Sequence, residues 1–515
     1  MTDRSRKLYL IYLGILSIAG GIAVYLASSK IGPGVSTDAA MMLSTAENLV
    51  KGQGLVDYRG VVLTQFPPLY SILLALGGLL FHQDVFTVGW ALAVLVFATT
   101  IWTSGLYFYQ AFREFPVLAY MASFIVFSSA SLIQISANIA SDPLFLLMVL
   151  GFLMLMSAFL HTGRLKYMFL VGVLVILACF ERYAGLTLVI TGALLVAFAN
   201  RMHPPRAAAR AALFGLVSGL PIVLWGYLHN VPVSGTAFGG RLPSIPSLNF
   251  TAGVEKVLYW FIPLRVISMT GPLALFALLL ALLLLAVLMS RRMGTLQNLL
   301  SPRVLPSVIF LLVYSAVLTF DISYYELRGI NTDRVHIILL PSLLLVVLNI
   351  AMPLLRAGAA RFGIRWVYAA VLLVFVIWSA YPLSKTDEYI RKSMLDGDVS
   401  SYNSINKGDI RTSPLTHYLL SLDLQDKQIY TNGSDSAWFI LHQQIDPTPI
   451  LNSDDRLASL QRDYATWPAK AGYVIWFNSE AHKESYARPE EISSIAPLQQ
   501  LYQDSEATVY YVARH

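Results

Sequence analysis

The sequence carries little charge and almost no cysteine. Only 13% of its 515 residues are Asp, Glu, Lys or Arg, whereas soluble proteins contain about 25%. This deficit excludes a soluble multidomain protein, a disordered chain and a fibrous one. The single cysteine, Cys179, excludes an intrachain disulfide and a cluster of thiolate ligands.

Common catalytic motifs are also missing. There is no Walker A loop, no HExxH pair, no CxxC pair and no Rossmann glycine fingerprint. A cytoplasmic nucleotide site is therefore unsupported. Hydrophobic residues, by contrast, make up 56% of the chain, and its mean hydropathy is +0.61. An excess of this size predicts a membrane protein.

Apolar runs of about 20 residues can cross the roughly 30 Å hydrocarbon core of a bilayer. The run Pro68–Phe81 has 14 residues, so we expect it to be an interfacial segment. Glu181-Arg182 separates two short spans, either as a corner at the outer face or within one kinked span. We expect the first run to be an uncleaved anchor rather than a signal peptide. The sequence thus predicts eleven spans, near residues 8–28, 86–108, 117–135, 143–160, 167–180, 184–200, 208–228, 267–290, 304–320, 336–355 and 366–384.

The net charge of +6 combines two unlike parts. Residues 1–384 hold 24 Lys and Arg and 12 Asp and Glu, a net of +12, and residues 385–515 hold 12 and 18, a net of −6. With the N-terminus in the cytoplasm, the short cytoplasmic loops hold 15 basic residues, and the longer outer loops before residue 385 hold nine. This bias satisfies the positive-inside rule. We therefore expect a multi-pass protein of the cell membrane, inner or plasma, whose partner is the lipid bilayer and not nucleic acid.

Residues 385–515 have the composition of a soluble domain, which we expect to lie outside the cytoplasm. β-Branched and aromatic residues predict strands at Gln428–Tyr430, Ala471–Phe477 and Thr508–Val512. Helices are predicted at Ala437–Gln443 and Asp454–Asp463. The expected fold class is therefore mostly α. It comprises a polytopic helical membrane domain, residues 1–384, and a small C-terminal α/β domain, residues 385–515.

Acidic residues gather on the predicted outer side, where ten of the 12 in residues 1–384 lie. Carboxylates near a membrane are costly and often mark function. Asp38, just after the first span, either caps the stretch Met41–Val50 or presents its carboxylate to a site. Asp142, before Pro143, is either an ordinary helix boundary or a second carboxylate. Two such groups at one depth can do acid–base work or hold a cation, so a divalent metal is left open.

Three arginines of the outer loops are candidates for an anion site. Arg182 lies between two spans, Arg241 lies in a long loop, and Arg334 lies just before the tenth span. The planar fork of a guanidinium matches a phosphate group. The alternatives for Arg182 are a structural ion pair with Glu181 and snorkelling to the interface.

Six motifs in this order resemble those of the GT-C superfamily of membrane glycosyltransferases. The likeness covers about residues 1–384, and it is strongest to bacterial relatives of the protein O-mannosyltransferases and of the lipid A aminoarabinose transferase. Many such bacterial proteins also carry a C-terminal α/β domain. The motifs are Asp38 through Gly54, Gln65-Phe66-Pro67-Pro68-Leu69-Tyr70, Ser141-Asp142-Pro143, Arg182-Tyr183-Ala184-Gly185, Gly240-Arg241-Leu242-Pro243 and Asp333-Arg334-Val335-His336.

The resemblance implies a phospholipid carrier-dependent glycosyltransferase with interfacial helices in its first outer loop. Its sugar donor would be linked to polyprenyl phosphate, and its acceptor would lie outside the cytoplasm. Asp38 and Asp142 are the implied catalytic residues, and Arg182 is the implied donor phosphate site. We expect Arg334 to assist Arg182 there. Further substrate contacts are expected from Gln65, Tyr183, Arg241 and His336. The chain departs from many relatives at Ala39, where they have Glu, at Gln65-Phe66, and at His336, where they often have Tyr.

The expected reaction is an inverting, single-displacement transfer in which Asp38 accepts the proton of the acceptor hydroxyl. No cofactor is implied beyond the divalent metal left open above. The alternative is a transporter or flippase of a lipid-linked glycan, whose ionisable groups would lie near the midplane of the bilayer. The charges here cluster at one face, which favours an enzyme. A non-catalytic receptor would leave Asp38 and Asp142 unexplained.

Overall fold

The computed structural model describes residues 3–239, 250–290, 294–324, 333–397, 405, 412–451, 455–478 and 483–514. These residues form two compact units, each built from several stretches of the chain. The first unit comprises Met1–Ser29, Thr64–Tyr70 and Trp90–Leu395. The second comprises Lys30–Leu63, Ser71–Gly89 and Asp396–His515.

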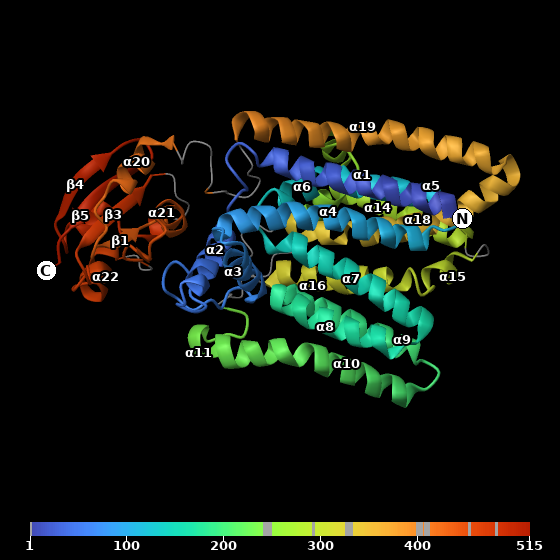
Figure 1. Cartoon of the computed structure of the whole chain (residues 1–515), viewed down its shortest axis with the longest axis horizontal. Coiled ribbons are helices and arrows are strands. Elements are labelled where there is room, and N and C mark those ends of the chain that lie inside the picture. Colours follow the sequence, from blue (N-terminus) through green and yellow to red (C-terminus); the bar gives the residue numbers. More distant parts are fainter. Residues whose placement is uncertain are drawn as a thin grey trace. The chain divides into compact units, whose positions relative to one another are not determined.

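The first unit is a helical bundle whose long helices run side by side (Figure 1). Within it α7 packs on α8, α10 packs on α8 and α9, and α18 packs on α5 and α16. Its helices are α1 (Asp3–Ala27), α4 (Val85–Ala111), α5 (Pro116–Phe127), α6 (Ala130–Ser136), α7 (Ser141–Thr162), α8 (Leu165–Glu181), η1 (Tyr183–Gly185), α9 (Leu186–Ala199), α10 (Pro204–Trp225), η2 (Gly226–Asn230), α11 (Val231–Ser234), α12 (Phe250–Tyr259), α13 (Leu264–Thr270), α14 (Pro272–Ser290), α15 (Thr295–Leu299), α16 (Leu305–Tyr324), α17 (Asp333–His336), η4 (Ile337–Leu339), α18 (Leu340–Phe362) and α19 (Ile364–Asp396).

Six helical segments in the described residues are long and apolar enough to cross a bilayer, and the number rises to at most eight if each of two bent helix pairs is one span. The bent pairs are α5 with α6, at 49°, and α13 with α14, at 94°. The chain is thus a multi-pass helical membrane protein, as expected. The figure of eleven spans stays a prediction, because α8 has 17 residues and α9 and α16 are short apolar helices.

The second unit contains α2 (Thr37–Val50), most of α3 (Leu69–Phe81) and the C-terminal α/β domain. The domain holds one mixed sheet with the strand order β2-β1-β3-β5-β4. Strand β1 is parallel to β2 and β3, and β5 is antiparallel to β3 and β4. The remaining elements are α20 (Pro414–Leu420), β1 (Gln428–Thr431), α21 (Ser434–Leu441), β2 (Ile445–Pro447), α22 (Arg456–Asp463), β3 (Gly472–Phe477), η6 (Lys483–Ser485), α23 (Pro489–Ile492), β4 (Leu498–Gln503) and β5 (Ala507–Val512).

The core of this domain packs under the sheet, with Tyr430, Val474 and Val512 from three neighbouring strands against Leu460 of α22 and Trp467. Burial of these side chains is the main source of stability for a small sheet. Glycine is required in β3, because a Cβ at Gly472 would overlap the carbonyl oxygen of Gln428 in β1.

The expected strands at β1, β3 and β5 and the expected helices at α21 and α22 are confirmed, with ends shifted by a few residues. Two strands were not predicted. Strand β2 has three residues and includes Pro447, and β4 reads Leu-Gln-Gln-Leu-Tyr-Gln and is largely exposed. Both lie at the edges of the sheet, where prolines and polar side chains are tolerated. The boundary at 384/385 stays a prediction, and α19 continues through it to Asp396.

Candidate active site

Asp38 lies in the first turn of α2 and is partly buried. The helix is capped by Ser36, whose side-chain oxygen accepts a hydrogen bond of 3.3 Å from the backbone N–H of Ala39. The capping position that we weighed for Asp38 therefore belongs to Ser36. A carboxylate in the first turn is favoured by the positive end of the helix dipole.

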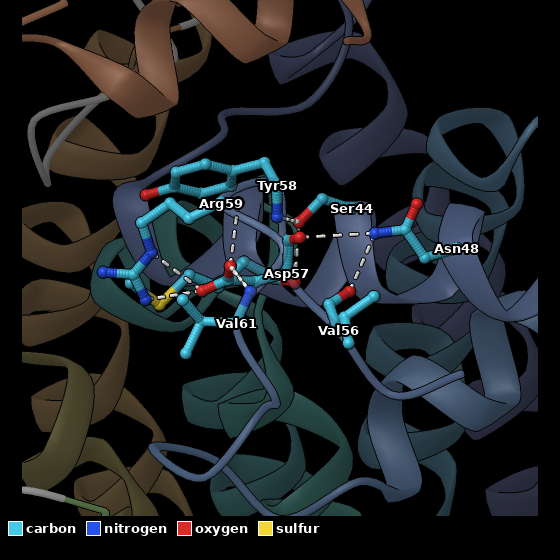
Figure 2. Close-up of polar contacts among 8 residues, drawn as sticks. Ser44, Asn48, Val56, Asp57, Tyr58, Arg59 and Val61 are labelled. Carbon is cyan, nitrogen blue, oxygen red and sulfur yellow. Dashed lines mark hydrogen bonds and ion pairs between the residues drawn. The ribbon is translucent and has the colours of Figure 1, made fainter. Parts of the chain in front are cut away.

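A short hairpin loop follows α2 and is fixed to it by buried polar contacts (Figure 2). Strand-like pairing joins Val56 and Val62. The Ser44 hydroxyl of α2 accepts a hydrogen bond of 3.0 Å from the Tyr58 N–H. The Asn48 amide of α2 donates to the carbonyl oxygens of Val56, at 2.9 Å, and Asp57, at 3.3 Å. These contacts orient α2 against the loop, so the two behave as one element.

The side chain of Asp57 stabilises this loop from its buried side. Its carboxylate, only 2% exposed, accepts from the Arg59 guanidinium and from the backbone N–H groups of Arg59 and Val61. A buried charge needs such partners, because an unpaired one carries a large desolvation cost. We therefore interpret Asp57 as structural rather than catalytic.

In the helical unit, Asp142 joins two arginines that are far apart in the sequence. It lies in the first turn of α7, and its side chain is 2% exposed. Arg182 Nη1 lies 2.7 Å from Asp142 Oδ1, and Arg334 Nε lies 2.5 Å from Asp142 Oδ2. Arg182 also donates to the Ser141 hydroxyl at 3.0 Å. Each carboxylate oxygen of Asp142 thus binds one arginine.

The two arginines reach Asp142 from short non-helical or broken segments. Arg182 has extended backbone angles between α8 and η1. The turn after it needs Gly185, because a Cβ there would lie 2.5 Å from the backbone nitrogen of Cys179. Arg334 belongs to α17, a helix of four residues. The hydroxyl of Tyr314 in α16 donates a hydrogen bond of 2.9 Å to the Val335 carbonyl of α17. Both side chains stay partly exposed, by 20% for Arg182 and 17% for Arg334.

Glu181 precedes Arg182 and is 1% exposed. Within the described residues, neither of its carboxylate oxygens makes a hydrogen bond. The structural pair between Glu181 and Arg182 that we considered is therefore replaced by the pair between Asp142 and Arg182. Glu181 is thus a buried carboxyl next to Arg182 that makes no hydrogen bond in the described part of the chain, and burial of such a group is costly for the fold.

The neighbouring polar groups are tied into the same unit. The Tyr183 hydroxyl donates to the carbonyl oxygen of Thr64 at 2.9 Å and accepts from the Asn230 amide at 2.7 Å. Asp333 accepts from the Ser131 hydroxyl at 2.5 Å. His336 is 5% exposed and lies against Gly253, where a Cβ would come within 2.8 Å of its Nε2.

Of the remaining candidates, one lies in the described residues. Gln65 is exposed, next to the Thr64 carbonyl that Tyr183 binds. Arg241 lies outside the described residues. Asn230 is a residue that sequence reasoning missed. The signal for it was an asparagine in a largely apolar segment. Asn230 is fully buried in the structure, and a buried amide requires hydrogen-bond partners.

A divalent metal is not supported by the residues around Asp142. Its oxygens are committed to two guanidinium groups, which repel a cation. Across the described chain, no group of three or more His, Cys, Asp or Glu side chains could hold a metal ion.

The arrangement can bind an anion. Two guanidinium groups share one carboxylate, so the three charges sum to +1. Both guanidinium groups are partly exposed, and the planar fork of a guanidinium matches a phosphate that approaches from the exposed side. The buried face of the cluster is the one that Asp142 and Ser141 occupy.

No protein-family profile matches the sequence, and neither does any curated protein. Solved structures do match in fold. The crystal structures of ArnT from Cupriavidus metallidurans, in the apo state and bound to undecaprenyl phosphate, each share 14% sequence identity with the chain at a TM-score of 0.57. Each match covers 96% of this chain and 97% of the other.

Two further matches involve larger proteins. The Archaeoglobus fulgidus oligosaccharyltransferase, in complex with Zn and sulfate, matches at a TM-score of 0.54 and 14% identity over 97% of this chain and 73% of its own. The arabinofuranosyltransferase AftD from Mycobacteria also matches at 0.54 and 14% identity, over 100% of this chain and 40% of its own. Identity this low establishes architecture and not activity. The chain therefore has the fold of the GT-C membrane glycosyltransferases, as its motifs predicted.

Proposed function

We propose that the chain is a glycosyltransferase that moves a sugar from a polyprenyl-phosphate donor to the hydroxyl of a lipid, glycan or protein acceptor. The observation that carries the proposal is the cluster in which Arg182 and Arg334 bind the two oxygens of Asp142. A cationic centre of this kind in a membrane protein fits a lipid-linked phosphate. The GT-C fold and the undecaprenyl phosphate bound to ArnT support the same class of donor.

In the proposed reaction the acceptor oxygen attacks the anomeric carbon while the bond from that carbon to the donor phosphate breaks. The configuration inverts, and the bonding electrons leave with polyprenyl phosphate. Arg182 and Arg334 stabilise the charge that develops on the phosphate. Asp38 takes the proton of the acceptor hydroxyl. Asp142 positions both guanidinium groups, because one carboxylate fixes two long side chains.

The positive-inside bias of the sequence supports a cell-membrane location with the N-terminus in the cytoplasm and the site on the opposite side. Donor and acceptor would then meet outside the cytoplasm, and the C-terminal domain would lie there too. Of the expected substrate contacts, Tyr183 follows Arg182 directly in the sequence, and we therefore place it near the donor phosphate. Gln65, Arg241 and His336 remain predictions from the family resemblance.

The test is a transfer assay with the purified full-length protein in lipid nanodiscs. Undecaprenyl-phosphate monosaccharides, labelled in the sugar, are supplied with a membrane extract as the source of acceptors. Release of undecaprenyl phosphate together with label on an acceptor is the expected result. Arg182→Ala should lower the rate by roughly 10²–10³-fold, the loss typical when one donor to a developing charge is removed.

The matched control is Glu114→Gln, which removes an exposed carboxylate that pairs with Arg356. This variant should transfer sugar at the wild-type rate. A flippase would give a different result, because in proteoliposomes it would move the labelled donor across the bilayer without releasing undecaprenyl phosphate. Such a result, or no release with any donor, would overturn the proposal.

A further inference from the structure

Within the second unit, α2 and the loop that follows it pack against helix α21 of the C-terminal domain. Near the start of that helix, Asp435 Oδ2 accepts a hydrogen bond of 2.5 Å from the hydroxyl of Thr37, the residue before Asp38. Just after its end, His442 Nδ1 lies 2.9 Å from Glu47 Oε1. The N-terminal ends of α2 and α21 are therefore in contact, and so are the residues near their C-terminal ends. The two helices run side by side in the same direction.

The spacing of these contacts agrees with two aligned helices. Thr37 and Glu47 are ten residues apart and Asp435 and His442 are seven apart. At 1.5 Å per residue these spans are about 15 Å and about 10 Å. The long side chains of Glu47 and His442 can make up the difference at the far end. At the near end Asp435 lies in the first turn of α21 and beside that of α2, where both helix dipoles favour a negative charge.

Buried contacts complete the attachment between these ends. Tyr58, in the loop fixed to α2, stacks on Trp438 of α21 with ring centroids 5.9 Å apart. The two residues are 5% and 3% exposed. The Tyr58 carbonyl accepts a hydrogen bond of 2.9 Å from the N–H of Ile445, the first residue of β2. On its other side Tyr58 is bound to Ser44 of α2 (Figure 2).

These contacts differ in how much each contributes to the attachment of α2 to α21. The pair of Glu47 and His442 is solvent exposed on the histidine side, at 52%, and such surface pairs contribute little. The stack of Tyr58 on Trp438 and the strand-like hydrogen bond to Ile445 are buried, so they stabilise the attachment more than the exposed pair does. The bond from Thr37 to Asp435 is also exposed, so its importance is not its strength but its place, at the residue before Asp38.

We propose that the C-terminal domain positions α2, and that Asp435 is a positioning residue that holds Asp38 through Thr37. The proposal rests on the transferase function proposed above. Removing the contact should leave substrate binding intact and slow the chemical step, because a displacement of about 1 Å at a reacting group costs up to about 10²-fold in rate.

The kinetic test compares Asp435→Ala and Thr37→Val in the transfer assay, with the full-length protein. Each should lower kcat about 10-fold or more while the donor KM stays within about twofold. The double variant should be no slower than the slower single variant, because both changes remove one interaction. Thr37→Ser, which keeps the hydroxyl, should restore most of the rate. The control is Asp463→Ala, which removes an exposed carboxylate of the same domain, and it should be unchanged.

A second readout does not depend on catalysis. Hydrogen–deuterium exchange of residues 37–50 should be faster in Asp435→Ala than in the wild type, and equal to the wild type in Asp463→Ala. Unchanged exchange and unchanged kcat in Asp435→Ala would overturn the positioning role, as would independent, multiplicative losses in the double variant. A wild-type protein that transfers no sugar would overturn the proposed function instead, and the exchange experiment would still decide the positioning of α2.

Discussion

The guanidinium of Arg334 donates to a carboxylate oxygen of Asp142 that lies 192 residues earlier in the chain. The other oxygen of Asp142 is bound by Arg182. A single nearly buried carboxylate therefore determines where two cations lie. Removal of the Asp142 carboxylate leaves two positive charges without their partner. Removal of one arginine leaves the carboxylate bound by the other arginine, so the consequences differ.

Asp142→Ala should lower stability more than any other single change in this cluster. It leaves two partly buried guanidinium groups facing each other, and loss of one partner of a buried ion pair costs about 3–5 kcal/mol. Because both arginines keep some access to solvent, we expect a value near the lower end. Thermal unfolding in detergent measures the change. Asp142→Asn keeps one oxygen that can accept from an arginine, so its stability should fall between the wild type and Asp142→Ala. An apparent Tm equal to that of the wild type in both variants would contradict the role of the carboxylate.

Asp38→Asn should retain the fold and lose transfer. The change keeps the shape of the side chain but removes the proton acceptor, and a general base contributes about 10²–10⁴-fold. The measurement is the single-turnover rate with bound labelled donor. Asp57→Asn is the comparison within the same loop region, since Asp57 is engaged with Arg59; it should reduce stability more than it reduces the rate of the folded fraction. Equal rates for Asp38→Asn and the wild type would remove Asp38 from the mechanism.

Gly185→Ala should disturb the turn that carries Arg182. The added Cβ would meet backbone atoms of Ala178 and Cys179 at 2.5–2.6 Å, and backbone atoms cannot give way as a flexible side chain can. We expect a loss of about 1–3 kcal/mol, the usual cost of overpacking, together with slower transfer. Gly172→Ala is the matched control in α8, because nothing lies within 4 Å of its added Cβ. That variant should be as stable as the wild type or more stable by about 0.5–1 kcal/mol.

The C-terminal domain should lose one stabilising contact in acid. Hydrogen bonds from Arg456 hold the pKa of Glu491 below its ordinary value. The pair therefore stabilises the folded domain at pH values above the unfolded pKa, and this contribution disappears as the pH falls through the lower folded pKa. Glu491→Gln should thus exchange faster than the wild type across residues 456–463 at pH 7, and the difference should shrink as the pH falls through the lowered folded pKa of Glu491. A difference that does not change with pH would show that packing, not charge, is responsible.

The membrane half could be predicted well because its physics is local in sequence. Apolar length alone locates most helices, and the 14-residue run before the second span became the short helix α3. Arg182 was expected to need an anionic partner. That the partner is Asp142, rather than the adjacent Glu181, depends on how α7 meets the turn after α8, and no periodicity reports that packing.

The contacts of the first loop with the C-terminal domain could not be predicted. Thr37 and Asp435 are 398 residues apart, and nothing in the pattern around either residue indicates the other. Strand β4 was missed for a related reason. Its polar side chains form an exposed edge, so its pairing with β5 comes from backbone hydrogen bonds and not from an alternation of apolar residues.

The assembly of the second unit from distant segments has a consequence for biosynthesis. The helix that bears Asp38 is synthesised well before the domain that it packs against, since Thr37 and Asp435 are 398 residues apart. Contacts of such long sequence separation form slowly, and until then the aromatic face of Tyr58 lacks Trp438. During translation Tyr58 therefore stays without its stacking partner until the residues from Asp435 onward have been synthesised. The positioning of Asp38 that we propose is complete only after α21 has folded against α2.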